Sequence, residues 1–439
     1  MIFVLEILFV IPLLIWFFSN INQYIYNLPI ITILFTAAGV FFVSPGYILV
    51  IIYAIVLFIL IIEKAKTLKV NIYIPILYIY MLVMVLFSTN VYGSITELHK
   101  FIFILMMYPI GYVYFKNYDQ LKLLNNAVTI VAVIFILNFI ISNLFNLGTA
   151  DYFELYSGTL SRVHSHIGAL FVVLVPLIFT LQKRTFFFNK YFVLLIGVLC
   201  FLILFLLMRR APILLMVSGI AVIFLFVNLF KKQNLIASIP IVLISIFALI
   251  YWSDSIISRF EGRGMVLSAE TIYIVDQLER EGRSREVFAV NDEIFNFENP
   301  AISFFGKEIL NEDYTEGRYV SYSDQQFARA GRDRSAHTSY TRYLSGTGIV
   351  GLILYVFVMF RMFTSFQKIV KKISDKKNKQ VFLIATFYAL FVLSILEWYS
   401  SSYFHLTHMP LLFLYLGAIN GVLKNENKKQ LLLKKIFNK

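Results

Sequence analysis

The sequence predicts an all-α polytopic membrane protein with about 12–13 transmembrane helices and one large, partly helical external (periplasmic) loop. Of its 439 residues, 59% are hydrophobic and 14% are charged, which exceeds the roughly 45–50% apolar content of soluble domains. The apolar residues fall into windows of about 17–22 residues, long enough to cross a bilayer as helices, and none has the roughly ten-residue alternation of barrel strands. The third observation is a polar stretch from residue 253 to residue 343 that interrupts the apolar windows.

This interruption divides the chain into three parts. Residues 1–252 form an N-terminal transmembrane bundle, residues 253–343 form the external loop, and residues 344–439 form C-terminal transmembrane helices with a basic cytoplasmic tail. The run 2–18 lacks a basic n-region and a cleavage site, so we expect a retained span rather than a signal peptide. The expected spans are 2–18, 28–44, 46–62, 72–88, 99–115, 124–145, 163–181, 190–208, 211–230, 234–252, 344–363, 380–398 and 403–423.

The lysines predict the orientation, because Lys and Arg are enriched in cytoplasmic loops. Strict alternation through the expected spans puts the lysine-rich loops and the tail 424–439 on one side. The chain is therefore expected to be a multi-pass protein of a bacterial inner (cytoplasmic) membrane, with the C-terminus cytoplasmic and the polar insert outside. The net charge of +13 follows this pattern, so no nucleic-acid partner is expected.

The polar insert carries ten arginines but one lysine, Lys307. Arginine grips phosphate bidentately through a planar fork, whereas lysine is a hydrated point charge. Acidic residues outnumber the basic ones, which excludes a polybasic lipid patch. The insert is expected to be a folded unit whose selected arginines face an anion.

Six arginines are candidates for an anion site. Arg209 and Arg210 open the expected span 211–230, where they either snorkel to the interface or line a cavity. Arg283 and Arg285 lie in Glu279–Phe288, where alternating charges also fit a solvated helix face. Arg334 and Arg342 flank His337, and Gly348 and Gly351 just after it favour close helix packing.

Few residues in the sequence are candidates for binding a metal or a cofactor. His164 and His166 diverge on a helix, so a metal site there is not expected; the insert has no Asp-x-Asp pair and no Cys/His cluster. Cys200 is expected to fill the core. Glu397, a charge at the external end of a span, is a candidate functional residue, and His405 and His408 beside it stay unassigned. No cofactor is expected, and the absence of a Walker sequence argues against an ATP-driven pump.

Several of these segments together resemble the O-antigen polymerase and O-antigen ligase superfamily of polytopic membrane glycosyltransferases. Arg210-Ala211 falls where that superfamily has Ser-Arg-Gly, with Arg209 at the serine position. Thr338, Phe288 and Thr341 depart from its asparagine, tryptophan and leucine. The other matching positions are Gly282-Arg283, Asn299-Pro300, Gly306, His337, Leu344 and the Gly-x-x-Gly from Gly348 to Gly351.

The resemblance implies a metal-independent transferase that takes a glycan from undecaprenyl pyrophosphate. As a polysaccharide repeat-unit polymerase, of the kind that serves lipopolysaccharide, it would join that glycan to another lipid-linked repeat unit. Arg210 and Arg283 would stabilise the departing pyrophosphate and His337 would accept a proton, with Arg209, Arg285, Arg334, Arg342 and Glu397 binding substrate. Membrane lipids and a chain-length regulator protein are further expected partners.

Two alternatives stay open. An O-antigen ligase would transfer the same glycan to lipid A core with the same arginines and histidine. A flippase or transporter for lipid-linked oligosaccharides would need no catalysis, but such proteins are commonly built from internal repeats, and none is visible in this sequence.

Overall fold

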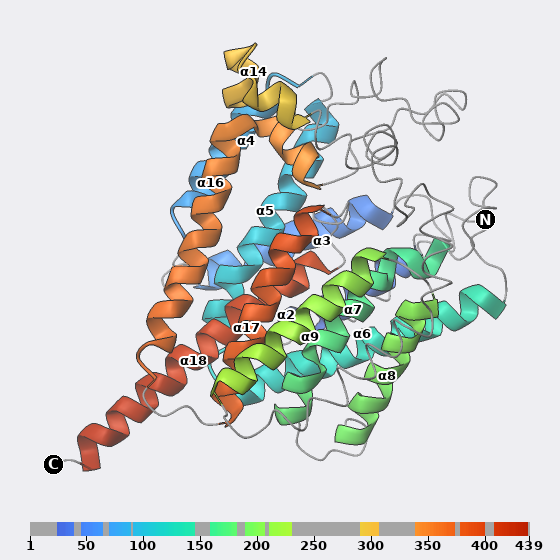
Figure 1. The fold of residues 1–439 in the computed structure, drawn as a ribbon, viewed down its shortest axis with the longest axis vertical. Coiled ribbons are helices and arrows are strands. Elements are labelled where there is room, and N and C mark those ends of the chain that lie inside the picture. Colours follow the sequence, from blue (N-terminus) through green and yellow to red (C-terminus); the bar gives the residue numbers. More distant parts are fainter. Residues whose placement is uncertain are drawn as a thin grey trace, which may run out of the picture.

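A computed structural model describes residues 24–38, 45–64, 70–88, 91–144, 159–181, 189–206, 210–230, 290–306, 339–373, 378–399 and 408–437. All secondary structure in these ranges is helical, in thirteen elements (Figure 1). They are α2 (Tyr24–Ala38), α3 (Pro45–Lys64), α4 (Tyr73–Val85), α5 (Val91–Tyr114), α6 (Tyr118–Leu144), α7 (Thr159–Leu181), α8 (Lys190–Leu206), α9 (Arg210–Phe230), α14 (Pro300–Phe305), α16 (Ser339–Val370), α17 (Asn378–Leu396), the 3₁₀ turn η3 (Glu397–Tyr399) and α18 (Met409–Phe437).

The all-helical class is confirmed for these residues, and eleven expected spans coincide with helices. Three helices are long and apolar enough to cross a membrane, over Tyr118–Ile141, Ser339–Val370 and Asn378–Leu396, and several shorter apolar helices accompany them. The expected spans 2–18 and 234–252 lie outside the described residues. The division at residues 252 and 343 also falls largely outside them, although α14 shows that part of the polar insert is helical.

Helices α5 and α18 pack closely through small residues. A methyl group added at Gly111 would meet the backbone of Leu414 and Ala418, and one added at Gly421 would meet the backbone of Tyr112 and Phe115. Because glycine has no side chain, the two backbones come into direct contact, as they commonly do between membrane helices. The two helices run parallel, because higher numbers in α5 face higher numbers in α18.

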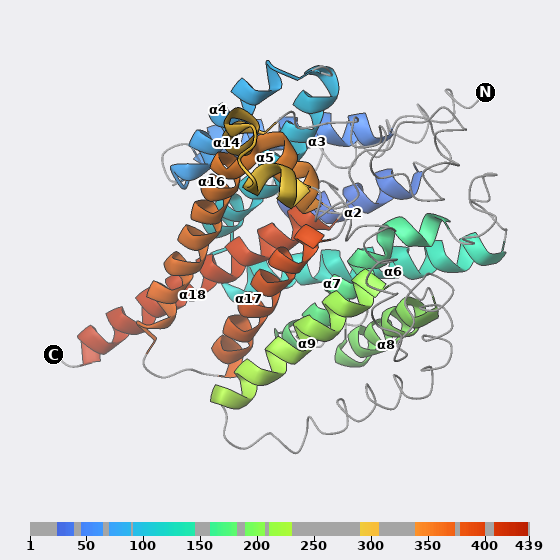
Figure 2. The same ribbon diagram turned by 45° about the horizontal axis from the view of Figure 1, so that its top comes forward.

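Helix α17 packs against α9, α7 and α18 (Figures 1 and 2). It runs antiparallel to α16, because Phe366 stacks on Phe387 with ring centroids 3.5 Å apart, while Tyr355 lies 4.2 Å from Trp398. Apolar side chains from all these helices form one continuous core. Many apolar residues on the outward faces are exposed, as expected of surfaces that meet lipid.

The contacts define two opposite ends of the helix bundle. The lysine end, as we name it, carries Tyr112 and Lys424, and also Tyr118 and Lys379, each lysine lying over the ring of its tyrosine. The opposite end, which we name the histidine end, carries His166, Arg342, Glu397 and His408 from the beginnings of α7, α16 and α18 and the end of α17.

At the histidine end, α14 lies across the first part of α16 (Figures 1 and 2). Helix α16 is kinked at Gly348, whose φ of 58° and ψ of −164° lie in a region that glycine adopts readily and other residues rarely do. A methyl group at Gly348 would lie 2.5 Å from the backbone of Phe304, and one at Gly306 would lie 2.6 Å from the backbone of Gly346. The backbone contact between Gly306 and Gly348 therefore holds the end of α14 against the kink in α16. We call this contact the Gly306–Gly348 lock.

Candidate functional site

Two of the site residues expected from the sequence have described side chains, and both lie at the histidine end. Glu397 begins η3, directly after α17, and Arg342 lies in the first turns of α16. For Arg210 the structure describes the backbone, as the first residue of α9. The remaining five, Arg209, Arg283, Arg285, Arg334 and His337, lie outside the described residues.

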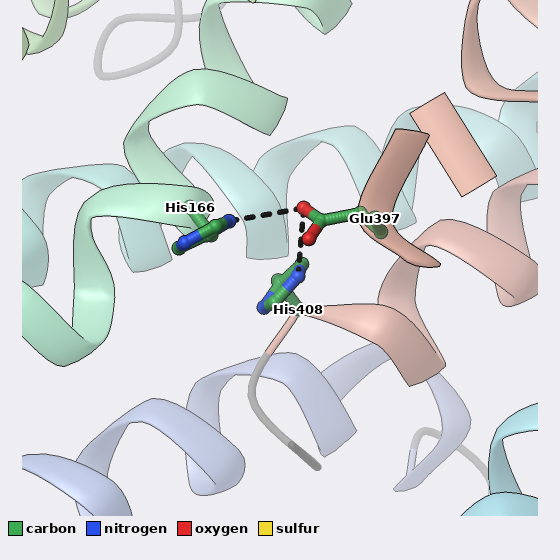
Figure 3. A group of neighbouring side chains, drawn as sticks. All are labelled: His166, Glu397 and His408. Carbon is green, nitrogen blue, oxygen red and sulfur yellow. Dashed lines mark hydrogen bonds and ion pairs between the residues drawn. The ribbon is translucent and has the colours of Figure 1, made fainter. Parts of the chain in front are cut away.

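Glu397 is the centre of a buried cluster with two histidines (Figure 3). Its Oε1 lies 3.0 Å from Nδ1 of His166 and 3.1 Å from Nε2 of His408. The side chains of Glu397 and His408 are 2% exposed and that of His166 is 11% exposed. The two imidazole rings stack with centroids 4.9 Å apart. We call these three residues the His–Glu–His cluster.

Local sequence explains how each member reaches the cluster. The apolar run of α17 ends at Leu396, and the 3₁₀ turn that follows points the carboxylate of Glu397 into the bundle. His408 directly precedes α18, and its carbonyl accepts the hydrogen bond from the N–H of Leu412, so its backbone begins that helix. His166 lies in the second turn of α7, between the buried residues Ser165 and Ile167. The cluster thus joins three helical elements.

The cluster is chemically unusual because a buried carboxylate is costly without charge or hydrogen bonds to offset desolvation. Both imidazoles direct a ring nitrogen at the same oxygen, which makes Glu397 a shared hydrogen-bond acceptor. Such an arrangement can hold or pass on a proton, and it can also supply ligands to a metal ion. His166, Glu397 and His408 each offer a ligand atom, and these atoms lie within 4.8 Å of one another.

A second polar group at this end pairs Arg342 with Glu97 of α5. Nη1 of Arg342 lies 3.3 Å from Oε2 of Glu97, whose other oxygen is 2.7 Å from Nζ of Lys100. Glu97 is 9% exposed, so this carboxylate shares two cations in a largely buried place. Glu97 therefore lies between two cations at this end of the bundle.

Aromatic side chains lie against both polar groups. Tyr343 of α16 packs edge-on against Trp398 of η3 with ring centroids 5.0 Å apart, and it lies 5.1 Å from Phe101 of α5. Nε1 of Trp398 donates to the hydroxyl of Tyr355 over 2.6 Å. Residue Trp398 directly follows Glu397, so this aromatic group connects the turn that carries the His–Glu–His cluster to the helix that carries Arg342.

Packing also places the start of α9 at the histidine end. Gly219 of α9 meets the side chain of Val173 in α7, and Phe226 stacks on Tyr388 of α17 with centroids 4.0 Å apart. Tyr388 of α17 precedes Glu397 and lies deeper in the bundle than Val173, which is close to His166 in α7. Residue numbers in α9 therefore increase with distance from the histidine end. Its first residue, Arg210, therefore begins the helix at that end. Three expected site residues, far apart in the sequence, come to one end of the bundle.

The sequence did not single out the two histidines that meet Glu397. His166 was considered only together with His164, and His408 had no assigned partner. The one available signal was Glu397 eleven residues before His408, both flanking expected spans. The partner on α7 lies 231 residues away from Glu397, and no local pattern reveals such a contact.

Comparison with known proteins adds no assignment. No protein-family model matches the chain, and no curated protein sequence matches it.

Proposed function

We propose that this protein is a membrane glycosyltransferase that polymerises polysaccharide repeat units carried on undecaprenyl pyrophosphate. The proposal includes 12–13 transmembrane helices in a bacterial inner membrane, with the polar insert and the histidine end outside and the lysine end cytoplasmic. The three long apolar helices support the membrane location. The lysine-bearing end, distinct from the Glu397-bearing end, supports the orientation because lysine favours the cytoplasmic side.

The observation that carries the proposal is the meeting of separate motif segments at the histidine end. Asn299 accepts the N-cap hydrogen bond of α14 from Ile302, Pro300 follows it, and Gly306 ends the helix. Gly306 then fits against the kink at Gly348. Asn-Pro, Gly and Gly-x-x-Gly are motif positions of the resembled superfamily, and their physical interlock supports reading them as one functional unit.

Charge and aromatic groups at the same end suit the proposed substrates. The lipid-linked donor carries a pyrophosphate, and this end of the bundle carries Arg342 and, at the start of α9, Arg210. Guanidinium groups stabilise phosphate through bidentate hydrogen bonds. Tyr340, which is half-buried beside Trp398, supplies an aromatic face of the kind that sugar rings pack against.

The proposed reaction exchanges one glycosidic bond for another. The acceptor hydroxyl oxygen bonds to the anomeric carbon of the donor glycan, and the bond from that carbon to the pyrophosphate oxygen breaks. His337 accepts the hydroxyl proton as general base, and Arg210 and Arg283 stabilise the departing pyrophosphate lipid. Arg209, Arg285, Arg334, Arg342 and Glu397 hold the substrates or orient the groups that do.

The test uses purified full-length protein with lipid-linked repeat units as the substrate and without added magnesium or manganese. The expected result is elongated glycan from the wild-type protein, and none from His337→Ala or Arg210→Ala at equal protein levels. Arg361→Ala is a matched control because Arg361 lies far along α16 from Arg342, over the ring of Tyr73. His99→Ala is the histidine control because the His99 ring packs against Tyr78 and Phe103, and both variants should elongate normally.

Two outcomes would contradict the polymerase. Transfer of glycan to lipid A core without elongation on lipid-linked repeats would instead establish the ligase alternative. Normal elongation by both His337→Ala and Arg210→Ala would remove the proposed catalytic residues.

A further inference from the structure

The His–Glu–His cluster has the ligand types of a transition-metal site. Imidazole nitrogen and carboxylate oxygen are the ligands that Zn²⁺ takes together with thiolate, and two histidines with one glutamate form a known catalytic zinc set. Such sets leave a fourth position open for water or substrate. All three residues come from separate elements, α7, η3 and the start of α18. The cluster thus offers three protein ligands without any further side chain.

The spacing from Glu397 to each histidine also fits, and all three ligand atoms lie within 4.8 Å of one another. Zinc–nitrogen and zinc–oxygen bonds of about 2.0–2.1 Å in a tetrahedron put neighbouring ligand atoms about 3.3 Å apart. In the structure Oε1 of Glu397 lies 3.0 Å from Nδ1 of His166 and 3.1 Å from Nε2 of His408. The ring nitrogens converge on one oxygen although the ring centroids are 4.9 Å apart. Small movements of these side chains accommodate an ion.

Burial separates this cluster from ordinary surface groups of histidine and acid. Glu397 and His408 are 2% exposed, and chance pairs of acidic groups at a surface have no such enclosure. A divalent cation offsets the desolvation of the carboxylate more completely than neutral imidazoles do, because it adds positive charge at bonding distance. The geometry and the burial therefore agree on a cation.

We propose that His166, Glu397 and His408 bind a divalent transition-metal ion of the zinc class at the histidine end. The ion replaces the two hydrogen bonds with coordinate bonds from Nδ1 of His166, Nε2 of His408 and a carboxylate oxygen of Glu397. Each imidazole then presents its lone pair to the ion and keeps its proton on the other ring nitrogen. Binding ties α7, η3 and α18 together at one point, independently of the glycosyl-transfer proposal, whose bond-making step uses no metal.

The first experiment measures zinc in the purified full-length protein, prepared with a histidine-free affinity tag so that the tag binds no metal. After incubation with Zn²⁺ and gel filtration, the wild-type protein should retain a stoichiometric amount of zinc by mass spectrometry. Glu397→Gln and His408→Gln should retain little, with affinity reduced by more than the roughly 10–100-fold that changes around metal ligands cost. The matched controls are Glu63→Gln, at the end of α3 where Glu63 accepts a hydrogen bond from Tyr114, and His99→Gln. Both should retain zinc as the wild type does.

A second measurement does not depend on how the variants fold. Wild-type protein loaded with Co²⁺ should show the strong visible absorption of a four-coordinate site, and X-ray absorption of the zinc-loaded protein should show imidazole ligands. Wild-type protein that stays free of metal after incubation would overturn the proposal, leaving a hydrogen-bonded cluster. Zinc held equally by the wild type and by folded Glu397→Gln and His408→Gln would overturn it as well, because the ion would lie elsewhere.

Discussion

The two ends of the bundle use charge in opposite ways. At the lysine end, Lys424 and Lys379 lie over tyrosine rings, 4.7 Å and 5.7 Å from their centroids, and both lysines are exposed. At the histidine end, charge is enclosed: Glu397 is buried between two imidazoles, and Glu97 is shared by Arg342 and Lys100. One end meets solvent through long flexible cations, and the other holds its charges inside the helices.

This difference teaches where charge serves structure and where it serves chemistry. Exposed cations at helix ends anchor a membrane protein at the interface and require no exact partner. Enclosed charges cost desolvation energy, and proteins retain them mainly where a function needs them. The comparison therefore directs attention to the histidine end, and the following changes are ways to break or sharpen it.

The largest effect is expected from Glu397→Ala. The change removes the acceptor that two imidazoles share, and each buried donor left without an acceptor costs about 1–3 kcal/mol. Thermal unfolding of the metal-free protein in detergent measures the loss. Glu397→Gln keeps one acceptor oxygen and should recover part of the stability. Equal stability of Glu397→Ala and the wild type would show that the cluster does not contribute to the free energy of unfolding.

A smaller but clear effect is expected from Gly348→Ala. The backbone at Gly348 is in a region that side chains rarely adopt, which costs about 1–3 kcal/mol, and the new methyl group would meet the backbone of Phe304. The lock between α14 and α16 should loosen, and the unfolding midpoint should fall. In Gly197→Ala, the control on α8, the methyl group meets only the side chain of Val175. A midpoint that falls as much in the control would contradict the special role of the kink.

The smallest effect is expected from Lys424→Met at the lysine end. This change removes the cation over the ring of Tyr112 and its hydrogen bond to the tyrosine hydroxyl. An exposed cation–π contact contributes about 0.5–1 kcal/mol, so the unfolding midpoint should barely move. A loss as large as that of Glu397→Ala would erase the contrast between the two ends.

The helices were largely predictable because apolar windows of bilayer length specify them. Helix α9 begins at Arg210 and ends at Phe230, where the sequence predicted 211–230. The prediction was less exact where polar residues continue a helix. Helix α16 begins at Ser339 rather than residue 344, and α18 continues from the expected end at 423 to Phe437, with a pair between Glu426 and Lys429 on that extension. The length of an apolar run does not reveal helical turns that contain polar residues.

The site was predictable only one residue at a time. Charge at the end of an apolar span singled out Glu397, and glycine spacing indicated close packing after His337; the structure confirms that packing at Gly348. Which residues meet Glu397 depends on how α7, α17 and α18 pack, and one sequence carries no record of such distant contacts. The same reason hid the pairing of Arg342 with Glu97, which are 245 residues apart.

The Gly306–Gly348 lock also has a consequence for how this chain can vary. Gly306 lies against the turn that follows Ser339, so the described segments on either side of residues 307–338 are held next to each other. A side chain at either glycine would push those two segments apart, and with them α14 and the first turns of α16 that carry Arg342.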